Sequence, residues 1–436
     1  MKGKIKDVAI IGYGTAGQAL ALLLARDGHR VQVFEQAPRM GPVGAGFLLQ
    51  PTGLQVLWEL GLLEAAITHG RRIERLYGET PSGRAVMDMR YAGLGGHLFG
   101  LGMQRGALFQ LMAQARPARV QVHEGRRIVS VDSDQGRVRD AQGREEGPFD
   151  LVIAADGSAS QLRAQVGAVR RDRPYPWGAL WCLVAQADWA WPQELRQRYV
   201  AARKMIGMLP VGTRPDDPTP QLSFFWSLPS DGYAHFCREG MPAWQAEVAA
   251  IWPHAAQRVA HLGQTDALAR AAYRDATVQQ WANGRLVLAG DAAHAMSPQL
   301  GQGVNMALLD AMALRDALRL PLPVPAALAS YQRERAAHVR IYQFWSRWLT
   351  PVFQSEQDLL ARVRDLAFLP LGRLPGGRGH MLRVLSGTQQ GVLGQRTLAP
   401  RFLQALRSLT DESVPRQDDL RAHGVRDDQL AALRNP

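Results

Sequence analysis

Residues 7–17 of the chain, DVAIIGYGTAG, decide the fold. The apolar run at 7–11 predicts a short buried strand, and the apolar segment at 15–27 predicts a helix that Gly28 ends. An alternating run at 31–35 predicts a second strand. A strand, a turn, a helix and a strand in this order form the first half of a doubly wound parallel sheet. The sequence therefore predicts an α/β fold with a Rossmann-like domain.

Three glycines occupy the turn after the first strand, with the spacing Gly-x-Gly-x-x-Gly. Gly12 permits a tight turn, Gly14 lets the backbone approach a pyrophosphate, and Gly17 lets the helix pack on the strand. Thr15 and Ala16 place free N–H groups at the positive end of the helix dipole. We therefore expect this turn to bind the phosphates of a dinucleotide.

Glu35 ends the second predicted strand. A carboxylate at this place can accept hydrogen bonds from both hydroxyls of a ribose, and it favours a nucleotide with a free 2′-hydroxyl. FAD and NAD both meet that condition. The alternative interpretation is an ordinary glycine turn beside an exposed glutamate.

A second stretch, residues 290–307 or GDAAHAMSPQLGQGVNMA, follows a strand predicted at 285–289 and leads into a helix predicted at 303–318. Asp291 at a strand end can hold a polyol, and Gly301 and Gly303 allow backbone amides to approach a flat ring. The helix start favours negative charge, which suits the pyrimidine end of a reduced flavin. FAD is therefore favoured over NAD, while Asp291 alone would also suit a helix cap and His294 a structural role.

The segment 171–277 differs in character, because it is rich in tryptophan and proline. It predicts a mainly antiparallel sheet with strands near 179–187, 205–210, 221–227 and 233–237. Elsewhere we expect one helix at 52–70, a meander of strands within 120–154 and helices over 326–370. The expected segments are FAD-binding parts at 1–75, 105–170 and 278–320, substrate-domain strands at 76–104, a substrate-binding sheet domain at 171–277 and a C-terminal helical region at 321–436.

Composition excludes several classes of function for these 436 residues, whose formal net charge is +12. Basic residues are not clustered in a nucleic-acid-binding module, so no nucleic-acid partner is expected. Cysteine and histidine spacing indicates no metal site. No apolar run is long enough to predict a membrane-spanning helix, so we expect a cytoplasmic protein. The positive field could attract anionic substrates or a membrane surface, and the oligomeric state stays open.

A third motif, ADGSASQLR at 155–163, completes a family pattern. With it, the chain resembles the single-component, class A FAD-dependent aromatic monooxygenases, the p-hydroxybenzoate hydroxylase-like group. The resemblance covers about residues 5–320, with the motifs in the family's order. It implies an α/β fold with antiparallel inserts, and it adds to the FAD contacts named above Gln36, Arg39, Gly46, Arg105, Asp156, Gly157, Gly290, Pro298, Val304 and Asn305.

The resemblance also implies a reaction. NADPH or NADH would reduce the flavin and leave, since these enzymes lack a separate nicotinamide domain and the chain carries no second glycine motif. Dioxygen would then give a flavin hydroperoxide, which hydroxylates a small organic, typically aromatic, substrate. The cofactor supplies the chemistry and the protein positions it.

The substrate site is the least readable part of the sequence. Tyr233 and His235, in the strand expected at 233–237, are candidate groups to deprotonate a phenol, and Pro298 lies in the expected flavin loop. Alternation along 221–227 places Phe224 and Trp226 on one face of a strand and Phe225 on the other. Together with Trp181, these aromatic residues are candidates for the substrate pocket, with plain sheet core as the alternative.

Two other classes of function stay open. A reductase or a halogenase could share the fold, although Trp189-Ala190-Trp191-Pro192 is only a partial echo of the halogenase Trp-x-Trp-x-Ile-Pro stretch. The net charge and the aromatic residues at 331–349 also allow a flavoprotein that docks on a membrane or a partner. That helix packing back on the protein is the simpler interpretation.

Overall fold

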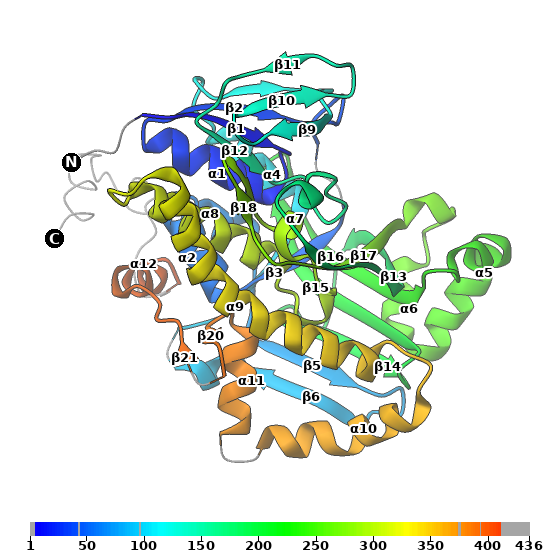
Figure 1. Ribbon diagram of the computed structural model, residues 1–436. Coiled ribbons are helices and arrows are strands. Elements are labelled where there is room, and N and C mark those ends of the chain that lie inside the picture. The colour runs from blue at the N-terminus through cyan, green and yellow to red at the C-terminus, as the bar shows by residue number, and fades with distance from the viewer. Residues whose placement is uncertain (1–4, 42–43, 96, 374–375, 393, 411–436) are drawn as a thin grey trace, which may run out of the picture.

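The computed structural model describes residues 5–41, 44–95, 97–373, 376–392 and 394–410. Within these ranges a six-stranded sheet has the order β18-β19-β12-β1-β2-β8, and its strands from β19 to β8 run parallel. Its central strands β1, β2 and β12 lie side by side in Figure 1. The strands are β1 (Asp7–Ile11), β2 (Arg30–Phe34), β8 (Gln121–His123), β12 (Leu151–Ala154), β18 (Ala282–Asn283) and β19 (Leu286–Leu288). Their apolar runs have both faces covered, as a parallel sheet requires.

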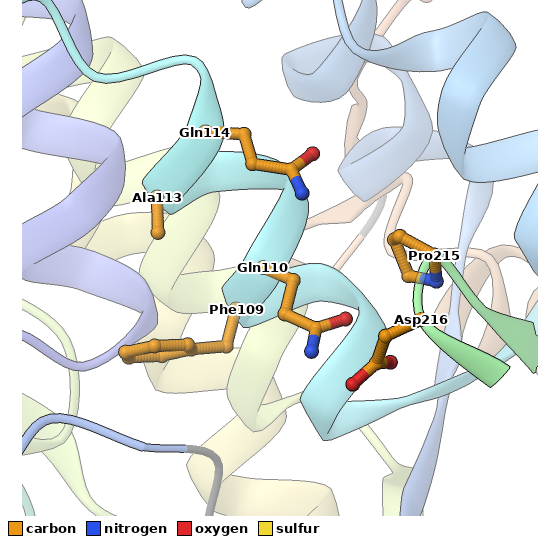
Figure 2. A pocket seen from close by; sticks show the side chains of 6 residues that line it. All are labelled: Phe109, Gln110, Ala113, Gln114, Pro215 and Asp216. Carbon is orange, nitrogen blue, oxygen red and sulfur yellow. The ribbon is translucent and has the colours of Figure 1, made fainter.

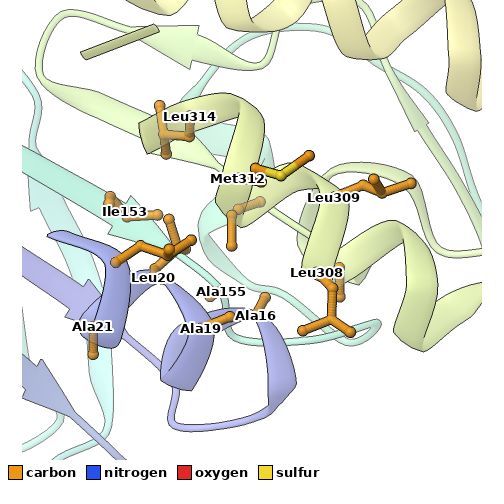
Figure 3. Close-up of a cluster of buried hydrophobic side chains, with 14 of the residues drawn as sticks. Ala16, Ala19, Leu20, Ala21, Ile153, Ala155, Leu308, Leu309, Met312 and Leu314 are labelled. Atoms are coloured by element: carbon orange, nitrogen blue, oxygen red, sulfur yellow. The ribbon is translucent and has the colours of Figure 1, made fainter. Parts of the chain in front are cut away.

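Helices α1 and α8 pack together beside this sheet. Small residues on α1, among them Ala16 and Ala19, lie in one buried cluster with Leu308 and Met312 of α8, and the two helices pack closely (Figure 3). The helices of this domain are α1 (Thr15–Arg26), α2 (Pro51–Glu59), α3 (Leu63–His69), α4 (Arg105–Gln114), α7 (Asp291–His294) and α8 (Gly303–Arg319). This core holds the turns after β1 and β19 in place.

A second, seven-stranded sheet has the order β17-β13-β16-β15-β14-β5-β6 within the described residues. All neighbouring pairs are antiparallel except β14 with β5. Its strands are β5 (Arg75–Glu79), β6 (Ala85–Arg90), β13 (Val169–Ala185), β14 (Glu194–Val200), β15 (Lys204–Arg214), β16 (Asp217–Pro229) and β17 (Ala269–Val278). Helices α5 (Tyr233–Ile251) and α6 (Pro253–Val259) pack on one face.

The other face of this sheet meets strands β3 and β7 and the C-terminal helices. A small sheet of β3 (Gly46–Leu49), β7 (Gly100–Gln104) and β4 (Arg71–Ile73) joins the two larger sheets. The long helix α9 crosses the molecule in yellow, and α10 continues below it (Figure 1). The C-terminal elements are α9 (Val324–Phe353), α10 (Asp358–Arg373), α11 (Gly377–Leu385), β20 (Gln389–Gln390), β21 (Gly394–Gln395) and α12 (Pro400–Thr410).

The predicted fold class is confirmed, but three local predictions are wrong. The strand expected at 233–237 is the start of α5, whose buried residues recur at helical spacing. The helix expected at 52–70 is two helices, because Gly61 adopts a positive φ of 65° between them. The expected meander is divided, since β8 and β12 join the parallel sheet while β9 (Ile128–Asp132), β10 (Arg137–Asp140) and β11 (Glu145–Glu146) form their own.

Candidate active site

Three motifs far apart in the chain meet at the carboxyl edge of the parallel sheet. Strands β1, β12 and β19 lie next to one another, so the turns that follow them are neighbours. A Cβ at Gly12 would lie 2.5 Å from the carbonyl oxygen of Ala155, and one at Gly290 would lie 3.1 Å from the Cβ of Ala16. The close approach of the three turns therefore depends on glycine at these two positions, where φ is also positive.

Glu35 lies at the same edge, after β2. Its Oε2 accepts a hydrogen bond of 2.7 Å from the backbone N–H of Tyr13, and its Oε1 accepts one of 2.9 Å from Ala37. These two bonds hold the carboxylate beside the glycine turn. A cavity of about 220 Å³ opens here, and its lining includes Gly14, Thr15, Glu35 and Arg105.

The edge has the free donors and the space that a flavin dinucleotide needs. A Cβ at Gly14, Gly301 or Gly303 would meet no atom within 4 Å, so the backbone at these positions faces open space among the described residues. No described side chain caps the start of α1 or α8, which leaves backbone N–H groups of both helices available. These features fit the pyrophosphate at α1 and the flavin ring at α8.

Asp156 also has an unpaired polar atom that a bound ligand could satisfy. Its Oδ1 is buried without a hydrogen-bond partner among the described residues. Burial raises the pKa of the Asp156 carboxyl above its ordinary value, although Ser160 and Arg163 oppose that shift. A buried polar atom of this kind is costly unless a ligand satisfies it.

Arg163, a residue of the ADGSASQLR motif without an expected role, ties two of the motifs together. This buried guanidinium donates to the carbonyl oxygens of Ser158, Asp291 and Ala292 at 2.8, 2.9 and 2.7 Å. It also pairs with Asp172 at 2.8 Å. Arg163 therefore fixes the backbone around Asp291. The motif itself was the signal that could have found it.

A buried charged cluster of Asp310, His294 and Arg335 contacts the Gly290 turn. Asp310 of α8 accepts a hydrogen bond of 2.7 Å from the backbone N–H of Gly290 and one of 2.7 Å from Arg335 of α9, and His294 Nε2 lies 2.6 Å from it. Burial alone would raise the pKa of Asp310, but His294 and Arg335 hold it well below its ordinary value. The readable signal for this cluster was an aspartate in the middle of the apolar run 306–314 of α8.

The predicted flavin-loop residue Asn305 uses its side chain to hold other parts of the protein. Asn305 Oδ1 accepts the backbone N–H of Gln50 at 2.8 Å, and its Nδ2 contacts the carbonyl oxygens of Leu48 and Gly301 at 3.3 Å. Pro298 begins a short 3₁₀ turn, and Val304 is buried in the first turn of α8. Asn305 thus connects the flavin loop with β3 and α2.

Other predicted cofactor-binding residues lie near the carboxyl edge of the parallel sheet. Gln36 and Arg39 are exposed after β2, and Gly157 follows Asp156 with a φ of 83°. Arg105 begins α4, and its side chain passes Gly44, where a Cβ would lie 2.9 Å from Arg105 Cδ.

The predicted substrate residues fall on opposite faces of the seven-stranded sheet. Phe224 and Trp226 face α5, with ring centroids 5.7 and 6.0 Å from that of Trp244. Trp181 and Phe225 lie on the opposite face, with their centroids 5.1 Å apart, in a cluster that also holds Phe353 of α9. We therefore withdraw Phe224 and Trp226 from the pocket, since α5 covers their face.

The predictions for Tyr233 and His235 are also wrong, because both residues lie on the α5 side of the sheet. Both lie at the start of α5, on the face of the sheet turned away from β3, and the His235 side chain is 68% exposed. We therefore withdraw both residues as candidates to deprotonate a substrate. The prediction failed because it assumed a strand, which would have alternated its residues between the two faces.

On the flavin side, Ser223 Oγ accepts the backbone N–H of Gly46 at 3.0 Å and so joins the sheet to β3. The tip of the β15–β16 hairpin also reaches α4. Between them lies a second cavity of about 240 Å³, lined by Phe109, Gln110, Ala113 and Gln114 of α4 and by Pro215 and Asp216 of the hairpin (Figure 2). Phe109 lines both cavities, so this one is next to the proposed FAD site.

Two absences apply to the part of the chain that the structure describes. It holds no group of three or more His, Cys, Asp or Glu side chains that could bind a metal ion. None of its helices combines the length and the apolar character needed to cross a membrane.

Together, the doubly wound sheet, the glycine turn and the convergence of three motifs define a dinucleotide-binding redox protein. Comparison with known proteins gives the family. The chain matches the FAD binding domain family over residues 6–343. It is 31% identical to a 3-amino-4-hydroxybenzoate 2-monooxygenase of Streptomyces platensis, over 84% of this chain and 93% of that protein. The chain belongs to this family, and it is an FAD-dependent monooxygenase of the class A, aromatic-hydroxylating group.

Other relatives agree with this membership. A 6-methylpretetramide 4-monooxygenase of Streptomyces rimosus is 29% identical over 89% of this chain and 94% of its own. Among solved structures, PqsL of Pseudomonas aeruginosa in complex with 2-aminobenzoylacetate superposes with a TM-score of 0.71 at 26% identity, covering 83% of this chain and 100% of that one. HpxO of Klebsiella pneumoniae complexed with FAD gives 0.73 at 23% identity, over 89% and 100%, and shows the shared fold.

Proposed function

We propose that the protein uses NAD(P)H and dioxygen to hydroxylate a small aromatic molecule held between the flavin edge and the seven-stranded sheet. The observation that carries this proposal is the convergence of the Gly14, Asp156 and Asp291 turns at one edge of the parallel sheet, beside β3, which Gly46 and Ser223 join to the seven-stranded sheet. When bound at this edge, FAD supplies the redox chemistry that activates dioxygen.

The FAD site is proposed residue by residue. Glu35 would hold the adenosine ribose, and the free amides at Gly14, Thr15 and Ala16 would bind the pyrophosphate with Arg105 beside them. Asp291 would hold the ribityl chain, because its backbone is fixed by Arg163 and by the bond between Gly290 and Asp310. The start of α8 at Gly303 would face the end of the ring that gains negative charge.

The nicotinamide donor is proposed to bind only transiently. The family motif at Asp156 and Gly157 is the implied shared contact, and it borders the same edge. The domain division proposed from the sequence also suits this scheme. Residues 1–75, 105–170 and 278–320 include all the strands of the six-stranded sheet, and 171–277 includes β14, β15, β16 and most of β13 and β17 of the seven-stranded sheet.

The test is NADH and NADPH oxidation over a panel of phenols, aromatic acids and heteroaromatic acids, with product mass measured. We expect one substrate class to accelerate oxidation and to gain one oxygen atom. Asp291→Ala should lose bound FAD and this activity, while Glu356→Ala, at an exposed site on the C-terminal side, should retain both. NAD(P)H oxidation that releases only reduced substrate would favour a reductase and contradict the proposal.

A second candidate function, docking on an anionic membrane, is favoured by one surface. Helices α9 and α10 expose Phe344 at 47%, Trp348 at 65% and Leu366 at 64%. Exposed Arg340 and Arg362 lie on the same helices, and this combination of apolar and basic residues suits an interface with anionic lipid.

Sedimentation with phosphatidylserine vesicles and with neutral phosphatidylcholine vesicles tests this docking. Binding to the anionic vesicles alone, reduced in Trp348→Ser, would support it. The control is Val392→Ser, a residue 76% exposed outside these two helices. Equal sedimentation with and without vesicles would exclude docking and leave the monooxygenase proposal intact.

A further inference from the structure

Three buried hydroxyl groups, the hydroxyl triad of Ser297, Ser346 and Thr350, join the flavin loop at 295–302 to the long helix α9. Ser297 Oγ lies 2.7 Å from Ser346 Oγ and 2.8 Å from Thr350 Oγ1. Thr350 Oγ1 donates to the carbonyl oxygen of Ser346 at 2.6 Å. With that proton used, Thr350 accepts the hydroxyl of Ser297, and Ser346 donates to Ser297 in turn. Every hydroxyl proton of the triad then has an acceptor, as buried polar groups require.

Ser297 directly precedes Pro298, and the flavin loop is fixed again at its far end. There Gln302 Nε2 donates to the carbonyl oxygen of Leu385, at the end of α11, at 2.6 Å. Ser297 and Gln302 are 3% and 1% exposed, whereas Gly301 between them is exposed, and a Cβ there would meet no atom within 4 Å. The middle of the loop therefore faces the open edge proposed for the flavin, while its two buried ends hold it there.

One face of α9 makes these contacts with the start of the loop. Ser346 and Thr350 are one helical turn apart, and Gln343 on the same face donates its Nε2 to the carbonyl oxygen of Ala276 at 2.9 Å. The backbone N–H of Ala276 in turn donates to the carbonyl oxygen of Ala295, where the loop begins, at 2.9 Å. The helix thus holds the loop both by direct hydroxyl contact and through β17. The three sequence motifs end before α9, so they did not indicate these contacts.

We propose that Ser346 and Thr350 are positioning residues that act through Ser297. They hold the Pro298 end of the flavin loop, so that oxygen is transferred to the substrate and is not released as hydrogen peroxide. The inference rests on the proposed function and adds two residues to its site. In the coupled reaction, NAD(P)H, a proton and dioxygen insert one oxygen atom into a C–H bond of the substrate and reduce the other to water. In the uncoupled reaction, the same hydride, proton and dioxygen give NAD(P)⁺ and hydrogen peroxide.

The position of the loop decides between these outcomes because both begin from the same reduced flavin and dioxygen. A loop held by buried hydrogen bonds closes the site against water and keeps its backbone aligned with the cofactor. When the triad is broken, the Pro298 end shifts, water enters and peroxide leaves sooner. Thr350→Val tests this directly, since valine keeps the branched shape of the side chain and removes both its hydrogen bonds.

The experiment uses the FAD-loaded protein, reduced with light and then mixed with dioxygen, so that neither a nicotinamide nor a substrate is needed. Reduced flavin, a proton and dioxygen give oxidised flavin and hydrogen peroxide, whose release a peroxidase assay follows. We expect Thr350→Val and Ser346→Ala to release peroxide about 3–10-fold faster than the wild type, the effect of one lost hydrogen bond on a rate. Because either change breaks the same triad, the double variant should be no faster than the faster single variant.

Thr350→Ser keeps the hydroxyl and should release peroxide as the wild type does, whereas a role in packing alone would make this variant the defective one. Thr68→Val is the matched control. Thr68 Oγ1 also donates to the carbonyl oxygen four residues earlier, that of Glu64, at 3.0 Å, but it lies exposed on α3. The circular dichroism of the bound flavin in the visible range is a second readout, and it should change in Thr350→Val but not in Thr68→Val.

Three results would overturn the inference. One is a rate of peroxide release and a flavin dichroism spectrum in Thr350→Val that equal those of the wild type. Another is a defect of equal size in Thr350→Ser, which would assign the effect to packing of the methyl group. The third is an unchanged ratio of peroxide to oxygenated product in Thr350→Val during turnover. All three leave the monooxygenase proposal in place. That proposal fails separately, if no aromatic molecule gains an oxygen atom during NAD(P)H oxidation.

Discussion

Some residues proposed to bind FAD also make hydrogen bonds that hold the protein's own backbone. Glu35 is a clear case, since both of its oxygens already accept backbone N–H groups, from Tyr13 and Ala37. A carboxylate held in this way is oriented before the ribose arrives, so little side-chain entropy is lost on binding. The sequence predicted the ribose contact, but the two supporting bonds became visible only in the structure.

Glu35→Ala should therefore weaken FAD binding without abolishing it. We expect a loss of about 1–3 kcal/mol, the range for a missing charged hydrogen-bond partner. Fluorescence titration of the apoprotein with FAD measures the change. Glu64→Ala, at an exposed position in the first turn of α3, is the control and should bind FAD normally. Unchanged affinity in Glu35→Ala would contradict the ribose assignment.

At the scale of elements, the turn after β12 and the turn after β19 are connected by one side chain. Arg163 reaches three carbonyl oxygens and one carboxylate, so its planar guanidinium holds the two turns at a defined separation. A lysine cannot reproduce these bonds, because its ammonium is a single point of charge.

Arg163→Lys should lower the free energy of unfolding by about 1–3 kcal/mol, since buried carbonyl oxygens lose their donors. It should also lower FAD occupancy, because the Asp291 backbone is released. Urea denaturation and the flavin absorbance of the purified protein provide the two measurements. Arg170→Lys changes an exposed arginine of β13 and should affect neither. Full occupancy in Arg163→Lys would show that the turn holds its place by other contacts.

At the scale of the whole molecule, α8, α9 and the C-terminal segment share a buried polar network. Arg335 donates to Asp310 at 2.7 Å and lies 2.6 Å from His338 Nδ1, while His338 Nε2 lies 2.9 Å from the carbonyl oxygen of Gly387. Because the Arg335 guanidinium is a donor, His338 Nδ1 must accept. Because the Gly387 carbonyl oxygen is an acceptor, Nε2 must carry the proton, and the His338 ring is therefore neutral. The network thereby connects the Gly290 turn to residues almost one hundred positions later.

This network predicts a loss of stability in mild acid. Burial and the charges of Arg335 and Arg396 lower the pKa of His338 to about 2, although Gly387 and Asp310 act in the opposite direction. Its pKa in the unfolded chain is about 6.5. Between these values the unfolded chain binds a proton that the folded protein does not. Stability should therefore fall as the pH drops below about 6.5, by up to about 1.4 kcal/mol per pH unit from this group.

Thermal unfolding from pH 8 to pH 5 checks this prediction by comparison of wild type with His338→Gln. The variant should start from a lower stability and lose less of it in acid. His261→Asn alters an exposed histidine and should keep the wild-type slope. Parallel slopes for wild type and His338→Gln would show that His338 does not contribute to the acid sensitivity.

The sequence by itself determined the parallel sheet, the glycine turn and the order of the three FAD motifs. These features depend on backbone conformation and on short apolar periods, and both are local properties of the chain. Only the tertiary structure decided which face of the seven-stranded sheet is covered by which helix. Residues 233–237, predicted as a strand, begin α5, which covers Phe224 and Trp226, while Trp181 and Phe225 lie on the opposite face. The pairing of Asp310 with Arg335 likewise joins distant segments, and such contacts arise from how elements pack, which local sequence patterns do not encode.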